Sequence, residues 1–309
     1  MGVINTWIAA AAGDWSDDAN WSLGHSPIEG EDPTFDGTSV NNCNADDPTP
    51  TGVLTIAAGY TGTITQSSDM HISGYSQAGG TFTGDVTKWV YCNGDYLVNA
   101  GTFTGGATRL EISGDSTLKI PTSYTNRLAG YYFNGKITHT NEVYVSGEVK
   151  GISGSLSGQN LVCYYADHLM PASTPVNINC TTVFKTNGGN TNFACLNYSF
   201  KEVSFEPINN VEKSTRTLNI NYDFVATTWK ILPSPAVTEQ TNIFKLNANV
   251  IITTLIYATI TDTQINEIDL NGHNLTASSI TVGTGGILQC GEGTITTTSL
   301  DSSAGTITP

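Results

Sequence analysis

A motif that recurs at a nearly fixed step between positions 71 and 120 limits the possible folds of this chain more than any other feature. Glycines stand at positions 74, 94 and 114, each two positions after an apolar residue. Gly80-Thr81-Phe82-Thr83-Gly84 returns as Gly101-Thr102-Phe103-Thr104-Gly105, and we expect Val98 to be matched by Leu118 one step later. Repetition at such a step indicates one supersecondary unit that is stacked on itself.

The residue types within each repeat predict β-strands. Runs such as Trp89-Val90-Tyr91-Cys92 and Arg109-Leu110-Glu111-Ile112 alternate with the period of two that is typical of half-buried strands, and no helical period interrupts them. We therefore predict an all-β, single-chain, right-handed parallel β-helix, with Cys92 and Ile112 in one interior column. An antiparallel sandwich or barrel with regular hairpins is the alternative, because it also has short strands at even spacing.

Composition supports strands and tight turns. Of the 309 residues only 13% are charged and 32 are glycine, which disfavours helix. We predict an N-terminal cap and attachment segment at residues 1–50 and the β-helix at residues 51–309. Between residues 121 and 250 polar stretches separate the strand-like runs, so wider coils or protruding loops are expected there. An inserted domain between about Tyr164 and Pro233 is the alternative.

Charge and cysteine usage restrict the partners and the compartment. Twelve basic and 27 acidic residues give a net charge of −15, which repels a phosphate backbone and argues against a nucleic-acid partner. The sequence shows no secretory signal and no transmembrane segment, so no membrane association is expected. The six cysteines lack a CxxC motif and are expected to be reduced and mostly buried.

Residues 1–50 have a different composition from the rest. They hold Trp7, Trp15 and Trp21, an acidic run from Gly13 to Pro27, and Asp32-Pro33-Thr34-Phe35-Asp36. The order of a glycine and a Trp, an Asn-Trp pair, a Gly and a Pro, and an acidic residue before an aromatic one resembles the opening segment of β-helical surface proteins. Such segments are seen in phage virion proteins and in autotransporter-like passenger domains. The resemblance implies the fold more directly than the function, because this class includes decoration proteins, adhesins, fibres and some enzymes.

The aromatic residues of this segment are the candidate site residues. The first coil of a solenoid exposes an apolar end and unpaired strand edges, which must be covered. We predict that Trp7, Trp15, Trp21 and Phe35 cap this end or attach it to a larger assembly. In the alternative, Trp7 and the first dozen residues form an arm that reaches a neighbouring subunit.

No catalytic residue is predicted. β-Helical lyases and glycosidases need a basic residue beside acidic groups, or two carboxylates about 5 to 9.5 Å apart. Arg109 and Lys119 are isolated, and Asp46-Asp47 lies before Pro48 in a connector that is typical of a solvated turn.

No metal or cofactor is predicted either. Five carboxylates near the N-terminus could coordinate calcium, but their spacing does not match an EF-hand loop and a solvated acidic face is the preferred interpretation. These residues are Asp14, Asp17, Asp18, Asp32 and Asp36.

A rigid repeated scaffold with few charges suits a structural role. We predict a bacteriophage virion protein that decorates the capsid as a cement or spike protein. It would be made in the host cytoplasm, form a homotrimer, and bind the major capsid protein or another virion protein through residues 1–36. The second hypothesis is a receptor-binding tail appendage or adhesin that holds glycan on its flank, for which exposed Tyr and Trp stripes are the diagnostic feature. A carbohydrate-active enzyme is the third.

Overall fold

A computed structural model of the chain describes residues 2–48, 51–104, 108–122, 126–164, 169–172, 174–186, 190–193, 195–207, 214–231, 240–257, 264–302 and 304–309. In these residues the chain is all-β and winds as a parallel β-solenoid of about 11 turns. The helix that interrupts the described strands is one 3-10 turn, η1 (Asp18–Asn20). The strand ladders of the described residues are parallel, which excludes the antiparallel sandwich and barrel; the right-handed winding stays a prediction.

The chain divides into two compact units. The first holds residues 1–148 and 156–159, and the second holds residues 149–155 and 160–309. The boundary falls within β15 (Val149–Gly158). No helix in the described part of the chain is long and apolar enough to cross a membrane.

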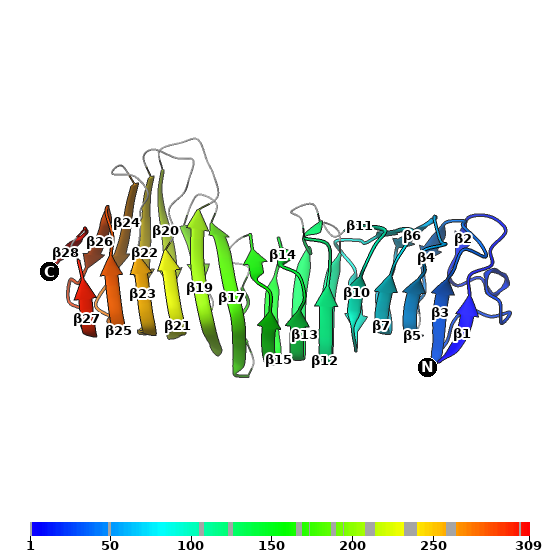
Figure 1. The fold of residues 1–309 in the computed structure, drawn as a ribbon, viewed down its shortest axis with the longest axis horizontal. Helices are drawn as coiled ribbons and strands as arrows, with labels where there is room; N and C mark the ends of the chain where they lie inside the picture. The colour runs from blue at the N-terminus through cyan, green and yellow to red at the C-terminus, as the bar shows by residue number, and fades with distance from the viewer. Residues whose placement is uncertain are drawn as a thin grey trace. The chain divides into compact units, whose positions relative to one another are not determined.

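The first unit has two rows of parallel strands, a long one and a short one (Figure 1). The long row consists of β1 (Val3–Thr6), β3 (Glu31–Phe35), β5 (Thr51–Ile56), β7 (Met70–Gln77), β9 (Trp89–Cys92), β10 (Tyr96–Val98), β12 (Arg109–Lys119) and β13 (Gly130–His139), and β14 (Val143–Val145) follows it in sequence. The short row consists of β2 (Gly13–Asp14), β4 (Cys43–Ala45), β6 (Thr63–Gln66), β8 (Thr81–Thr83) and β11 (Thr102–Thr104).

The repeats of the sequence are the coils of this unit. Cys92 pairs with Ile112 and Phe82 pairs with Phe103, so both predicted matches are confirmed. Cys92 and Ile112 are 1% and 0% exposed and lie in the predicted interior column. Apolar side chains at every second position thus stack coil over coil in the core.

The predicted match between Val98 and Leu118 is wrong, because Leu118 pairs with Tyr96. The preceding ladder pairs Cys92 with Ile112 as the repeat predicts. The next paired residues are Tyr96 and Leu118. The segment from Ile112 to Leu118 is longer than the equivalent segment from Cys92 to Tyr96, so the later coil has extra residues at its bend. A bend absorbs extra residues because its side chains are not fixed by the interior column.

Strands within residues 1–50 already belong to the long row. β1 pairs with β3, and β3 pairs with β5. The other edge of β1 is covered by the chain itself, since the Ser22 N–H donates to the Thr6 carbonyl at 2.9 Å. The buried Asn5 amide donates to the His25 carbonyl at 2.9 Å and accepts from the Leu23 N–H at 3.2 Å.

The second unit has the same construction (Figure 1). One row consists of β16 (Leu161–Cys163), β17 (Val176–Thr186), β19 (Tyr198–Pro207), β21 (Phe224–Ile231), β23 (Val250–Tyr257), β25 (Asn274–Val282) and β27 (Thr294–Asp301). The other row consists of β18 (Asn190–Phe193), β20 (Ser214–Ile220), β22 (Gln240–Leu246), β24 (Gln264–Asp269), β26 (Gly286–Gln289) and β28 (Thr306–Thr308).

Coil length changes along this unit. Val225 pairs with Ile251, and Ile251 pairs with Thr276. Thr276 pairs in turn with Thr296, so the last of these coils is the shortest. The interior is rich in packed rings, such as those of Phe184 and Phe193, whose centroids lie 4.9 Å apart.

Candidate functional site

The four predicted site residues form one aromatic cluster inside the first coils. Trp7, Trp15, Trp21 and Phe35 are at most 1% exposed. The Trp15 and Trp21 ring centroids lie 4.8 Å apart and those of Trp7 and Trp21 lie 5.2 Å apart, in edge-to-face arrangements. The Trp21 indole N–H donates to the Trp15 carbonyl at 2.7 Å. A capping role for these residues stays a prediction, and their side chains offer no surface to a partner.

Other apolar residues of this segment are exposed at its surface. Val3, Ile4 and Ile28 are 61%, 60% and 52% exposed, and Ile8 and Leu23 are 41% and 42% exposed. Trp7 is buried within the chain that carries it, so an arm formed by the first dozen residues would present Val3, Ile4 and Ile8 instead.

The N-terminal carboxylates are used one by one in local hydrogen bonds. Asp17 accepts from the Ala19 N–H, Asp18 accepts from the Ser26 N–H, and Asp32 accepts from two N–H groups. In the described ranges no group of three or more His, Cys, Asp or Glu side chains could hold a metal ion. These carboxylates therefore accept hydrogen bonds from backbone N–H groups in turns and at strand edges.

A row of large side chains on the outer face of the first unit forms a better candidate. Strand register places His71, Tyr91, Glu111 and Tyr132 opposite one another on β7, β9, β12 and β13. A neighbouring row holds Trp89 and Arg109. We call the set of Trp89, Tyr91, Tyr132, His71, Arg109, Glu111 and Glu148 the aromatic face.

Ring contacts lock the aromatic face. The Trp89 and Tyr132 ring centroids lie 4.5 Å apart, and His71 stacks on Tyr91 at 4.5 Å with ring planes 10° apart. The Arg109 guanidinium lies 4.4 Å from the centroid of the Trp89 ring in a cation–π contact. Trp89, Tyr91 and Tyr132 are only half-buried, so each keeps surface for a ligand.

Gly130 explains why a tryptophan and an arginine fit in the second row. It pairs with Arg109 across the strands. A Cβ at this position would lie 3.2 Å from the Arg109 Nε and 3.5 Å from the Trp89 ring. The missing side chain leaves the space that these two groups occupy.

Hydrogen bonds organise the polar groups of the face. One oxygen of Glu148 accepts from the Tyr132 hydroxyl at 2.8 Å and from the Arg109 guanidinium at 3.1 Å. Burial, followed by the hydrogen bond to Glu148, raises the pKa of Tyr132 to about 12. Burial, followed by the charges of Asp69 and Glu111, raises the pKa of Tyr91. Both phenols are therefore protonated at neutral pH, and Glu148 is held by two donors.

The arrangement suits recognition. Rigid aromatic rings offer contact area at low entropic cost, and the guanidinium, phenol and carboxylate groups beside them can exchange hydrogen bonds with a polyhydroxylated ligand. C–H faces of sugar rings pack on aromatic side chains in the same way that other apolar groups do.

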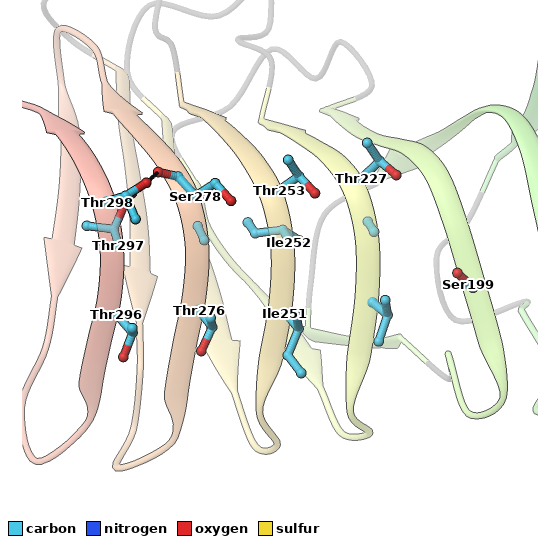
Figure 2. A pocket seen from close by; sticks show the side chains of 13 residues that line it. Ser199, Thr227, Ile251, Ile252, Thr253, Thr276, Ser278, Thr296, Thr297 and Thr298 are labelled. Carbon is cyan, nitrogen blue, oxygen red and sulfur yellow. Dashed lines mark hydrogen bonds between the residues drawn. The ribbon is translucent and has the colours of Figure 1, made fainter.

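A second candidate is a groove of about 430 Å³ on the outer side of β19, β21, β23, β25 and β27 (Figure 2). Thr227, Thr253, Ser278 and Thr298 follow one another across neighbouring strands along it (Figure 2). The Thr298 hydroxyl donates to the Ser278 carbonyl at 2.6 Å. Among the described residues that line it there is no charged or aromatic side chain, and these residues offer hydroxyl and apolar contacts.

A third hollow, of about 600 Å³, lies near the N-terminus beside Ile4, Asp32 and Val53. The Asp32 carboxylate accepts from the Gly2 and Val53 N–H groups, both at 2.8 Å. The Asp32 carboxylate thus connects neighbouring coils through hydrogen bonds.

The aromatic face is not among the predicted sites, although the sequence carries a signal for it. Cys92 faces inward, so the period of two turns Trp89 and Tyr91 outward. The recurring step then places Arg109 beside Trp89 and Glu111 beside Tyr91. Glu148 lies outside these repeats and only the structure reveals it.

No protein-family model, no curated protein and no solved structure matches this chain. The resemblance of residues 13–36 to phage virion and autotransporter-like proteins therefore rests on the sequence pattern alone. In its architecture the chain is a parallel β-solenoid.

Proposed function

We propose that the protein is a non-catalytic β-solenoid appendage of the receptor-binding or adhesin type, which binds glycan through the aromatic face. The observation that carries the proposal is the half-buried cluster of Trp89, Tyr91 and Tyr132 on outward positions of neighbouring strands. A stripe of this kind is the feature that favours glycan binding over plain decoration.

Charge and packing support a binding role for this face. Arg109 and Glu148 form an ion pair at 3.1 Å; Arg109 lies over the Trp89 ring and Glu148 accepts from the Tyr132 hydroxyl. Preformed contacts reduce the entropy that a ligand would otherwise cost on binding. The Glu148 carboxylate accepts from both Arg109 and Tyr132, so it is held in one orientation beside the rings.

A specific observation also supports the decoration hypothesis. The large apolar side chains of Val3, Ile4 and Ile28 are each more than half exposed on the first coils. Exposed apolar side chains are a feature of protein interfaces. In this proposal the protein is a trimer in the virion, bound through its first coils to the major capsid protein or another virion protein, and its flank contacts glycan.

The test is a glycan-array screen of the purified chain followed by calorimetric titration with the glycans that bind. Trp89→Ala and Tyr91→Ala should each weaken binding about 30-fold, because an aromatic anchor contributes about 2 kcal/mol. Tyr144→Ala is the matched control: Tyr144 is half-buried on β14 and its hydroxyl donates to Glu142 at 3.1 Å. Thermal melting verifies that the variants are folded. Unchanged affinity in both variants, or no glycan that binds, would refute the proposal.

A further inference from the structure

A tight turn, Leu270-Asn271-Gly272-His273, connects β24 to β25 in the second unit. Asn271 and Gly272 have φ of 47° and 80°, and the His273 N–H donates to the Leu270 carbonyl at 2.8 Å, which defines a type I′ turn. Both central residues are exposed, and a Cβ on Gly272 would meet no atom of the described residues within 4 Å. The backbone around Gly272 is therefore open to water.

An exposed hydrogen bond connects the Asn271 side chain to the preceding turn of the same row. The Asn271 amide donates to the Asn247 Oδ1 at 3.0 Å, and the Asn247 amide donates to the Asn221 Oδ1 at 2.8 Å. We call Asn221, Asn247 and Asn271 the asparagine ladder. One exposed hydrogen bond contributes only about 1 kcal/mol, so it orients the Asn271 amide without locking it in place.

We propose that Asn271 deamidates spontaneously through attack by the Gly272 backbone nitrogen, and that the product breaks the asparagine ladder. The Gly272 nitrogen gives its proton to hydroxide and forms a bond with the Asn271 Cγ. The Cγ–Nδ2 bond breaks, and the leaving nitrogen takes a proton from water and departs as ammonia. Water then opens the cyclic imide at one of its two carbonyl carbons. The product is aspartate or isoaspartate, and no oxidant or cofactor is needed.

The two other Asn-Gly pairs in the described ranges, Asn93-Gly94 and Asn134-Gly135, are held more firmly. The second pair lies within β13, where Gly135 pairs with Gly114 in the parallel ladder. In the first pair, the Asn93 Oδ1 accepts from the Ser113 hydroxyl at 2.6 Å and the Asn93 N–H donates to the Ile72 carbonyl at 3.0 Å. Such contacts must open locally before the pair can react, which reduces the rate to that of the open fraction.

Deamidation removes the donor on which this end of the asparagine ladder depends. A carboxylate at position 271 cannot donate to the Asn247 Oδ1. It also adds a negative charge beside Asp269, whose carboxylate accepts from the Asn271 N–H at 2.9 Å. Isoaspartate further inserts a methylene group into the backbone of the turn that leads into β25. Because β25 pairs with β23 and β27, a disturbed turn weakens the coils that β25 joins.

The experiment incubates the purified full chain at mildly alkaline pH and follows each Asn-Gly pair by mass spectrometry of its peptides. Asn271 should react at least about tenfold faster than Asn93 and Asn134 in the folded chain. In concentrated urea the structural protection is lost, and the three pairs should react at similar rates. A rate at Asn271 no higher than at the other two pairs, or a difference that persists in urea, would overturn the proposal.

The effect on the asparagine ladder is measured with Asn271→Asp, which mimics the product. This variant should lower the urea midpoint of unfolding by about 0.3 M, because it loses a hydrogen bond. Asn93→Asp is the matched control: Asn93 is also exposed and two residues from an aspartate, Asp95, but its Oδ1 accepts a hydrogen bond that a carboxylate still accepts. An unchanged midpoint in Asn271→Asp, or an equal decrease in both variants, would overturn the role of the ladder.

Discussion

At the scale of single residues, His139 is a buried base in the first unit. It is 1% exposed, and its Nε2 lies 2.9 Å from the Tyr131 hydroxyl. Burial lowers the pKa of His139 to about 3, against an opposing effect of a backbone hydrogen bond with Gln159. The imidazole is therefore neutral in the folded chain across the ordinary pH range.

This neutral state predicts loss of stability in acid. The unfolded chain has the higher pKa, about 6.5, so it binds the proton more readily, and the free energy of unfolding falls as the pH drops from about 6.5 toward 3. Each pH unit in this window costs up to about 1.4 kcal/mol. His139→Phe should flatten this part of the curve when urea unfolding is measured against pH. The same series on His273→Asn, at a turn, serves as control, and an unchanged slope in His139→Phe would contradict the argument.

At the scale of elements, β12 and β13 depend on a pair of glycines. Gly114 and Gly135 pair across β12 and β13 and have φ of 81° and 122°, values that a side chain makes unfavourable. A Cβ on Gly135 would clash with the Gly114 carbonyl, whereas the nearest atom to a Cβ on Gly114 is 3.6 Å away.

The two glycines therefore form a matched pair for mutation. Gly114→Ala should lower the free energy of unfolding by about 1–2 kcal/mol, the cost of the left-handed backbone alone. Gly135→Ala adds a backbone clash and should cost more than about 3 kcal/mol. Urea unfolding of both variants measures the difference; equal losses would show that the neighbouring coil yields to the new methyl group.

The apolar pattern of the sequence predicts the strands better than the bends that connect them. Interior columns such as Cys92 and Ile112 follow from apolar spacing, because one slip would turn every side chain to the other face. The lengths of bends do not follow from it, and Leu118 accordingly pairs with Tyr96 instead of Val98. Contacts on the outer face are the most difficult to predict from the sequence. Glu148, for example, accepts a hydrogen bond from Tyr132 but lies outside the repeats.

At the scale of the whole molecule, we expect the protein to associate into a trimer. Val3 and Ile4 are 61% and 60% exposed on β1, and a closed trimer would cover such surface. We expect light scattering to give three times the chain mass at micromolar concentration. Val3→Ser with Ile4→Ser should lower this mass to that of the monomer. Ile251→Ser, at a residue 54% exposed on β23, is the control. A monomeric parent protein would contradict the trimer.

The burial of Trp7 changes how attachment should be tested. Deletion of residues 1–12 would remove β1 and the Trp7 ring from the core along with the attachment surface. Substitutions at exposed Val3 and Ile4 separate the two effects, because they leave the aromatic cluster in place. The composition of residues 1–50 indicated an unusual segment, but only the structure distinguishes its buried rings from its exposed aliphatic side chains.

The short step between paired residues also determines how the chain can acquire its structure during synthesis. Each strand pairs with one that precedes it closely in sequence, as Ile112 does with Cys92 in the first unit and Ile251 with Val225 in the second. A ribosome adds about 5–20 residues each second, so a complete coil emerges every few seconds and finds its partner strand already present. The nascent chain can wind progressively, each new coil adding its strands to the edge left by the coil before it.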